Sequence, residues 1–112
     1  MSYQYADFRG NVVPFTGSFT LTINDNGKVF RCDDPSNVVV TVPSDLHTGF
    51  NVGFVMYNTG IVTLAAAPHA VNKSGKTALS TQYQSGSLMV MKRTGGPGIL
   101  GDIEYLVGGD FA

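Results

Sequence analysis

Apolar and polar residues alternate along most of the chain after residue 18, in short runs bounded by turn residues. The run FTLTI (19–23) places Phe19, Leu21 and Ile23 on one side, and VVVTV (38–42) repeats the pattern. Alternation with period two is typical of strands that bury one face, and several short runs of this kind favour a β-sandwich or barrel. The sequence therefore predicts an all-β fold, namely a small antiparallel β-sandwich or barrel with a jelly-roll-like arrangement.

Two sets of turn residues predict β-hairpins. Asn26 and Gly27 stand between FTLTI and KVFRC (28–32), and both residue types tolerate the positive φ of a tight hairpin turn. Residues 58–60, Asn-Thr-Gly, separate NVGFVMY from IVTLAAA in the same way, and a left-handed conformation is expected at Gly60.

The strand predicted over residues 51–57 has two different faces. Val52, Phe54 and Met56 share one face, and Val55 and Tyr57 share the other. The first set is predicted to fill the sandwich, and Val55 and Tyr57 are predicted to meet a neighbouring subunit or sheet.

The second half of the chain is less regular. SLMVMKR (87–93) and DIEYLV (102–107) are predicted as the last two strands, with a glycine-rich segment between them. Residues 68–86 are polar and are predicted as a long loop, in which AVN (70–72) and TAL (77–79) add short pieces of strand.

Residues 1–18 lack clean alternation and are predicted as an extended N-terminal arm that precedes the sandwich domain of residues 19–112. Aromatic residues on a flexible leader suggest an arm that orders against a partner. An arm that packs back on its own sandwich is the alternative, since terminal segments need something to hold them. The aromatic arm residues are Tyr3, Tyr5, Phe8 and Phe15.

Charge is scarce and nearly balanced. Charged residues make up 13% of the chain and the net charge is −1, which leaves no field to attract nucleic acid or an anionic membrane. Neither is therefore expected as a partner. No apolar run reaches the length of a membrane span, and the start MSYQYADFRG is unlike a signal peptide. The single cysteine, Cys32, is predicted to pack as a small apolar side chain, which suits a reducing cytoplasm.

The chain offers little catalytic chemistry. SGKT (74–77) has the end of a phosphate-binding loop, but Ala70 stands where that motif needs glycine, so a polar turn is predicted instead. His47 and His69 have no metal-ligand spacing. No catalytic, cofactor-binding or metal-binding residue is predicted, and the chain is expected not to be an enzyme.

A glycan hydrolase is the enzymatic alternative. Asp102 and Glu104 alternate along the last predicted strand at a spacing of about 7 Å, within the range of a glycosidase carboxylate pair. The competing interpretation is an edge strand that carries solvent-facing charges, which resist aggregation.

Four segments carry a resemblance to a known kind of domain: LTINDNGKVFRC, VVVTVPSDLHTGFNVGFVMYNTGIVTLAAAP, SGSLMVMKR and DIEYLVGGD. Their order resembles a domain of bacteriophage structural proteins, including head fibres, capsid decoration proteins and tail-fibre modules. The resemblance leaves residues 1–18 outside. Ile103 and Tyr105 occupy the last strand, where such domains often carry a tryptophan.

The resemblance implies a non-enzymatic structural protein of the virion, assembled in the host cytoplasm and often a homotrimer. Small size and a single domain with a leader favour a capsid decoration, or cement, protein on the outer head surface. Such a protein would bind the major capsid protein through the aromatic residues of its arm.

A tail-fibre or receptor-binding module is the alternative function. Its loops would recognise a host surface glycan or protein through aromatic and amide side chains. Tyr83, between Gln82 and Gln84, is the cluster of that kind in the sequence.

Overall fold

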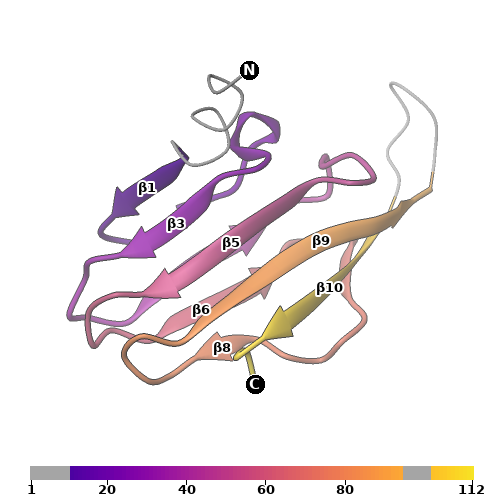
Figure 1. Cartoon of the computed structure of the whole chain (residues 1–112). Helices are drawn as coiled ribbons and strands as arrows, with labels where there is room; N and C mark the ends of the chain where they lie inside the picture. Colours follow the sequence, from indigo (N-terminus) through magenta and orange to yellow (C-terminus); the bar gives the residue numbers. More distant parts are fainter. Residues whose placement is uncertain (1–10, 95–101) are drawn as a thin grey trace, which may run out of the picture.

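Two β-sheets pack face to face in the computed structural model, which describes residues 11–94 and 102–112 (Figure 1). A six-stranded sheet has the order β1-β3-β5-β9-β10-β7, and a four-stranded sheet has the order β2-β4-β6-β8. A 3-10 turn, η1 (Ile23–Asp25), precedes β3. The strands are β1 (Val12–Phe15), β2 (Phe19–Thr20), β3 (Val29–Cys32), β4 (Val38–Val42), β5 (Asn51–Met56), β6 (Val62–Ala66), β7 (Ala70–Asn72), β8 (Ala78–Leu79), β9 (Ser85–Arg93) and β10 (Ile103–Gly109).

The predicted β-sandwich is confirmed, but its sheets are mixed. From β1 to β6 the chain crosses from one sheet to the other after every strand, so that strands of successive turns pair in parallel. Val29 pairs with Gly53 and Val38 pairs with Val62, in both cases 24 residues further along the chain. The first six strands therefore form a flattened coil. The wholly antiparallel, jelly-roll-like arrangement expected from the sequence is wrong for this half.

Both predicted hairpins are corners of this coil. The strands on either side of residues 58–60, β5 and β6, lie in different sheets, and so do β2 and β3 on either side of Asn26 and Gly27. Turn residues report that the chain changes direction, and the alternating pattern reports which face is buried. A hairpin within one sheet and a crossing between two sheets both need turn residues and both keep one strand face buried. The two signals therefore do not distinguish between them.

Close approach of two backbone segments requires glycine at the corner between β5 and β6. The N–H of Gly60 donates to the carbonyl oxygen of Asp34 at 3.1 Å, and a Cβ at Gly60 would overlap the carbonyl oxygens of Asp34 and Ser36. The φ of Gly60 is not positive, so the predicted left-handed conformation is wrong. The absence of a side chain, which lets two backbones approach, explains this glycine.

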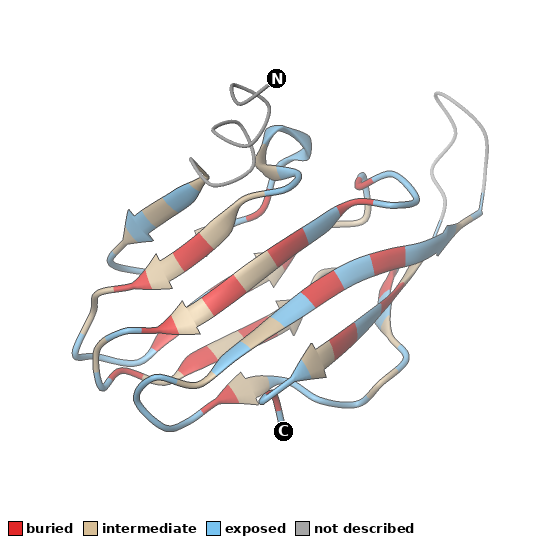
Figure 2. Ribbon diagram, in the orientation of Figure 1, coloured by how far each residue is buried: buried red, intermediate tan, exposed pale blue. Residues whose placement is uncertain are grey.

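A single apolar core lies between the sheets. Figure 2 shows the buried residues as regular stripes across the strands, as the period-two pattern predicts. Phe30 stacks on Phe54 with ring centroids 5.7 Å apart, and Phe111 meets Phe54 edge-on at 6.0 Å. Cys32 is fully buried among these residues, as predicted, and burial raises the pKa of its thiol.

Every antiparallel pair among the described strands includes β8 or β9. β9 pairs with β5 on one side and β10 on the other, and β8 pairs with β6. β10 lies between β9 and β7, so the interpretation of residues 102–107 as an edge strand is wrong. The short strands expected within residues 68–86 are confirmed as β7 and β8.

The sandwich begins before residue 19. β1 pairs with β3 along its whole length, and the ring of Phe15 packs edge-on against Phe19 at 5.0 Å and Phe30 at 6.0 Å. Residues 11–18 therefore belong to the domain, and the boundary expected at residue 18 is wrong for them. The pairing of β1 with β3 was not predicted, because Pro14 and the lack of alternation argue against a strand over residues 12–15.

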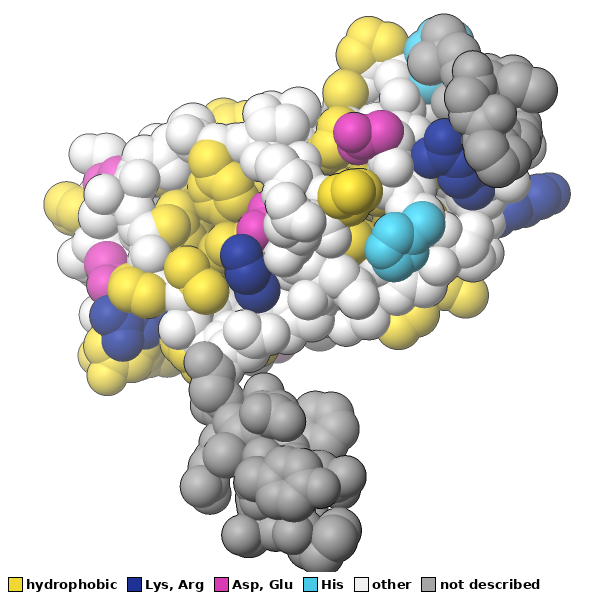
Figure 3. Space-filling view, turned by 90° about the horizontal axis from the view of Figure 1, so that it is seen from above, with side chains coloured by type: hydrophobic (Ala, Val, Ile, Leu, Met, Phe, Trp, Pro, Cys, Tyr) yellow, Lys and Arg dark blue, Asp and Glu magenta, His cyan; other side chains and the backbone are white. Residues whose placement is uncertain are grey.

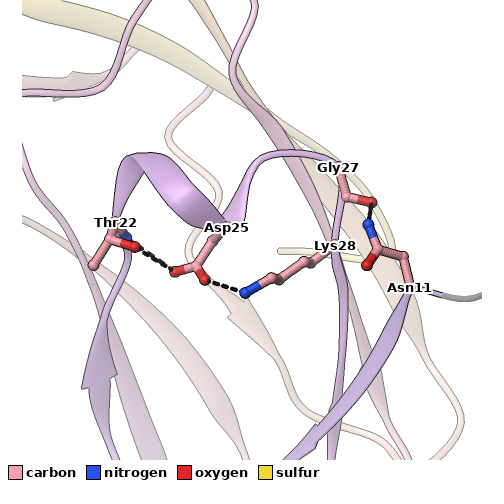
Figure 4. A network of polar contacts seen from close by, with 5 residues as sticks. All are labelled: Asn11, Thr22, Asp25, Gly27 and Lys28. Carbon is pink, nitrogen blue, oxygen red and sulfur yellow. Dashed lines mark hydrogen bonds and ion pairs between the residues drawn. The ribbon is translucent and has the colours of Figure 1, made fainter.

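Polar contacts hold the start of β1 and the turn before β3 in place (Figure 4). The side-chain amide of Asn11 donates to the carbonyl oxygen of Gly27 at 3.2 Å. In η1, Asp25 accepts from the backbone N–H of Thr22 at 3.0 Å and from the ammonium of Lys28 at 2.9 Å. Burial alone would raise the pKa of Asp25, but these two donors outweigh it and lower the pKa below 3.8.

Candidate functional site

The residues expected to anchor an arm fall into two groups. Tyr3, Tyr5 and Phe8 lie outside the described residues. Phe15 is partly buried against the core of its own domain, which is the alternative that the sequence left open for this part of the segment. Partner binding by the first three stays a prediction.

Val55 and Tyr57 lie on the face of β5 opposite the core, as predicted. Val52, Phe54 and Met56 are buried, whereas Val55 is half-buried on the outer face and Tyr57 is 55% exposed just beyond the strand. Their contact with another subunit stays a prediction.

The outer face of the six-stranded sheet also carries exposed apolar side chains that the sequence analysis did not single out. Met89 on β9 lies opposite Leu106 on β10, and Glu104, the next outward residue of β10, pairs with Val71 on β7. Met91 is exposed beside the register shift between β9 and β10. We call Met89, Met91, Leu106 and Val71 the methionine patch. The alternation in SLMVMKR and DIEYLV predicts that Met89, Met91 and Leu106 face outward. Sequence alone does not say that these strands lie beside β7, which carries Val71.

A second cluster lies where β3 and β5 end and β9 begins. We call it the tyrosine corner, as a description of this surface cluster and not in the sense of the buried motif of Greek-key sandwiches. It consists of Tyr57, Tyr83, Arg31 and Asp33. The rings of Tyr57 and Tyr83 meet edge-to-face with centroids 5.7 Å apart, and the guanidinium carbon of Arg31 lies 5.4 Å from the centre of the Tyr57 ring. The structure thus joins a residue predicted for a subunit interface to one predicted for a glycan-binding loop. Their separation of 26 residues in sequence hid that contact.

The turn that carries Tyr83 is pinned to the end of β5. The N–H of Tyr83 donates to the carbonyl oxygen of Met56 at 2.6 Å, and the side-chain amide of Gln82 donates to that of Tyr57 at 3.2 Å. The side-chain oxygen of Gln84 accepts from the backbone N–H groups of Ser80 and Thr81 at 3.0 and 3.1 Å. These bonds fix the position of the exposed ring.

A two-point ion pair lies beside the ring of Tyr57. Nε and Nη2 of Arg31 donate to the two carboxylate oxygens of Asp33 at 2.9 and 2.8 Å. The hydrogen bonds from Arg31 hold the pKa of Asp33 below its usual value, and the same bonds raise the pKa of Arg31. Both side chains therefore stay charged, and because their charges are opposite, the tyrosine corner carries no net charge.

The described residues bring together little catalytic chemistry. Nδ1 of His69 lies 2.7 Å from Oδ1 of Asp102, and both side chains are about half exposed. No group of three or more His, Cys, Asp or Glu side chains suited to a metal ion occurs within residues 11–94 and 102–112. The SGKT segment forms a turn between β7 and β8, where Asn72 accepts from the N–H groups of Ser74 and Gly75 at 3.0 and 3.2 Å.

A shallow depression of about 200 Å³ lies on the four-stranded sheet instead. It is lined by Ser18, Phe19, Thr20, Val39 and Thr41. None of these residues is charged, so the depression holds no acid or base for catalysis.

A scan against protein-family models gives no match, and a search of curated proteins finds no sequence of significant similarity. Among the described residues, no helix has the length and apolar character needed to cross a membrane.

Proposed function

We propose that this chain is a non-enzymatic structural protein of a bacteriophage particle, most simply a capsid decoration protein on the outer head surface. The observation that carries the proposal is the methionine patch, which lies on the same sheet face as Val55. Isolated exposed apolar side chains are ordinary, whereas a group of them on one face marks an interaction surface.

Surface composition supports the proposal. Figure 3 shows charged side chains as separate groups among uncharged polar and hydrophobic surface. Interface cores are depleted of charge and enriched in methionine and aromatic residues. The resemblance in element order adds the virion as the setting and the homotrimer as the assembly. The major capsid protein is the partner proposed for Tyr3, Tyr5 and Phe8.

The trimer is tested by changing one exposed apolar residue on each sheet. Leu106, in the methionine patch, is 45% exposed, and Val39, on the outer face of the four-stranded sheet, is 42% exposed. We expect a trimeric mass for the parent chain by light scattering at micromolar concentration, a monomeric mass for Leu106→Lys, and a trimeric mass for Val39→Lys. Because the two sites match in exposure, general disruption by lysine would affect both variants. A monomeric parent chain would contradict the trimer.

A receptor-binding module is the second candidate function. The specific observation that favours it is the tyrosine corner. There Tyr83 lies on a turn fixed by hydrogen bonds, its ring contacts that of Tyr57, and Tyr57 lies beside the ion pair of Arg31 and Asp33. In this function the corner recognises a molecule of the host surface, and the rest of the sheet face is free for assembly.

A further inference from the structure

Tyr83 has a backbone conformation that its side chain does not explain. Its φ is +71°, in the left-handed region, and the residue is 68% exposed. A left-handed residue with a side chain costs about 1–2 kcal/mol relative to glycine or asparagine. Burial of a large ring would offset that cost, but this ring is mostly in solvent. The strain therefore points to a role outside the stability of the domain.

The corner is built to hold its shape. Backbone and side-chain hydrogen bonds fix the turn on both sides of Tyr83, and its edge-to-face contact orients the ring of Tyr57. A site whose groups are already in place loses less entropy when it binds a ligand.

The polar groups beside Tyr57, whose ring contacts that of Tyr83, have unused hydrogen-bonding capacity. A guanidinium has five N–H donors, and Arg31 uses two of them on Asp33. Each carboxylate oxygen of Asp33 has a further lone pair. The ion pair therefore offers donors and acceptors side by side. Its charges cancel, which disfavours an anion such as phosphate and favours a neutral ligand.

We propose that the tyrosine corner binds a neutral pyranose sugar. The apolar C–H face of the sugar packs on the exposed ring of Tyr83, and adjacent hydroxyl groups, each a donor and an acceptor, bond to Asp33 and Arg31. This site deepens the second candidate function by naming its ligand class. A single shallow site of this kind gives millimolar affinity, and several copies on one assembly raise the avidity.

The test uses the purified full chain and the methyl glycosides of glucose, galactose, mannose and N-acetylglucosamine as probes. We expect at least one glycoside to shift the amide resonances of Tyr57, Tyr83 and Asp33 in a ¹⁵N-resolved NMR titration at millimolar concentrations. No shift with any of the four, or shifts confined to other residues, would overturn the proposal. A proline-rich peptide that alone shifted these resonances would also overturn it, in favour of peptide recognition.

Tyr83→Asn separates binding from folding. Asparagine tolerates a positive φ, so we expect this variant to melt at the same or a higher temperature while its affinity for the responsive glycoside falls about tenfold or more. Tyr83→Phe, which keeps the ring, is the matched control and should retain binding. Undiminished binding by Tyr83→Asn would refute the assignment. The head-surface location is measured separately. A failure of sugar binding therefore leaves the decoration function untouched.

Discussion

Tyr105 is buried in the core, yet its hydroxyl has no hydrogen-bond partner among the described residues. An unpaired buried hydroxyl costs about 1–3 kcal/mol. Burial also raises the pKa of Tyr105 above 10.0, because the ionised phenolate is disfavoured there.

Tyr105→Phe is therefore expected to raise the free energy of unfolding by about 1 kcal/mol at neutral pH. Above pH 10.0 the unfolded chain loses the Tyr105 proton before the folded chain does, so stability falls by up to about 1.4 kcal/mol per pH unit until the folded pKa is reached. The phenylalanine variant lacks this contribution and should lose stability less steeply. Urea unfolding at neutral and alkaline pH measures both effects. A destabilised variant at neutral pH would show that the hydroxyl has a partner.

Gly60 supports the assignment of a stacked corner. Gly60→Ala is expected to destabilise the protein by about 3 kcal/mol or more, because the new methyl group meets backbone rather than a side chain that can turn away. Gly108→Ala is the control, since a Cβ there has no neighbour within 4 Å and φ is not positive. Chemical denaturation of the two variants gives the comparison. An equal, small effect at both positions would argue against the coil.

At the scale of elements, the carboxylate of Asp34 links two corners of the coil. It accepts from the N–H of Gly17, in the corner between β1 and β2, and from the N–H of Ser36, in its own corner between β3 and β4, each at 2.8 Å. These bonds, that from Ser36 first, lower the pKa of Asp34 below 3.8. A carboxylate with a lowered pKa stabilises the fold above its unfolded pKa, and this contribution is lost as the pH falls through the folded pKa.

Asp34→Asn should therefore lower the melting temperature at neutral pH, and the difference from the parent should close only below pH 3.8, the usual value for this carboxyl. The amide keeps one acceptor oxygen and places N–H donors against a backbone N–H. Asp45→Asn, at an exposed aspartate, controls for the loss of one negative charge. A difference that did not change with pH would mean that the carboxylate is not what joins the corners.

The pattern of the sequence predicted what each strand buries, but not which strands are neighbours. Val38, Val40 and Val42 are buried as predicted, and so are Val52, Phe54 and Met56. Which strands pair depends on whether the chain stays in the same sheet or crosses to the other sheet after each turn. Asn58 and Gly60 form a turn in either topology, so the parallel coil could not be read from them.

The same limit applies to the candidate site. The outward position of Tyr57 followed from alternation with Phe54 and Met56, and Tyr83 stood out as an aromatic residue in a polar loop. Their contact depends on the pairing of β5 with β9 and on the turn before β9, and the pairing is a long-range feature. Neither the positive φ of Tyr83 nor the neighbouring ion pair has a signal in local sequence.

At the scale of the whole molecule, the two faces of the six-stranded sheet have different roles in this account. The inner face fills the sandwich. The outer face carries Val55 and the methionine patch, for which we propose a role in assembly, and the tyrosine corner at one end, for which we propose a role in recognition. A chain with few charges suits standing contacts with other subunits, because charged side chains at an interface core must be desolvated.

The proposed decoration function requires the protein to lie on the heads of the particles. Antibody raised against the purified chain, with a gold label, is imaged by electron microscopy on particles of the bacteriophage that we propose as its source. We expect gold distributed over the heads. Gold confined to the tail or its tip would contradict the decoration function in favour of receptor binding, and unlabelled particles would contradict a place in the virion.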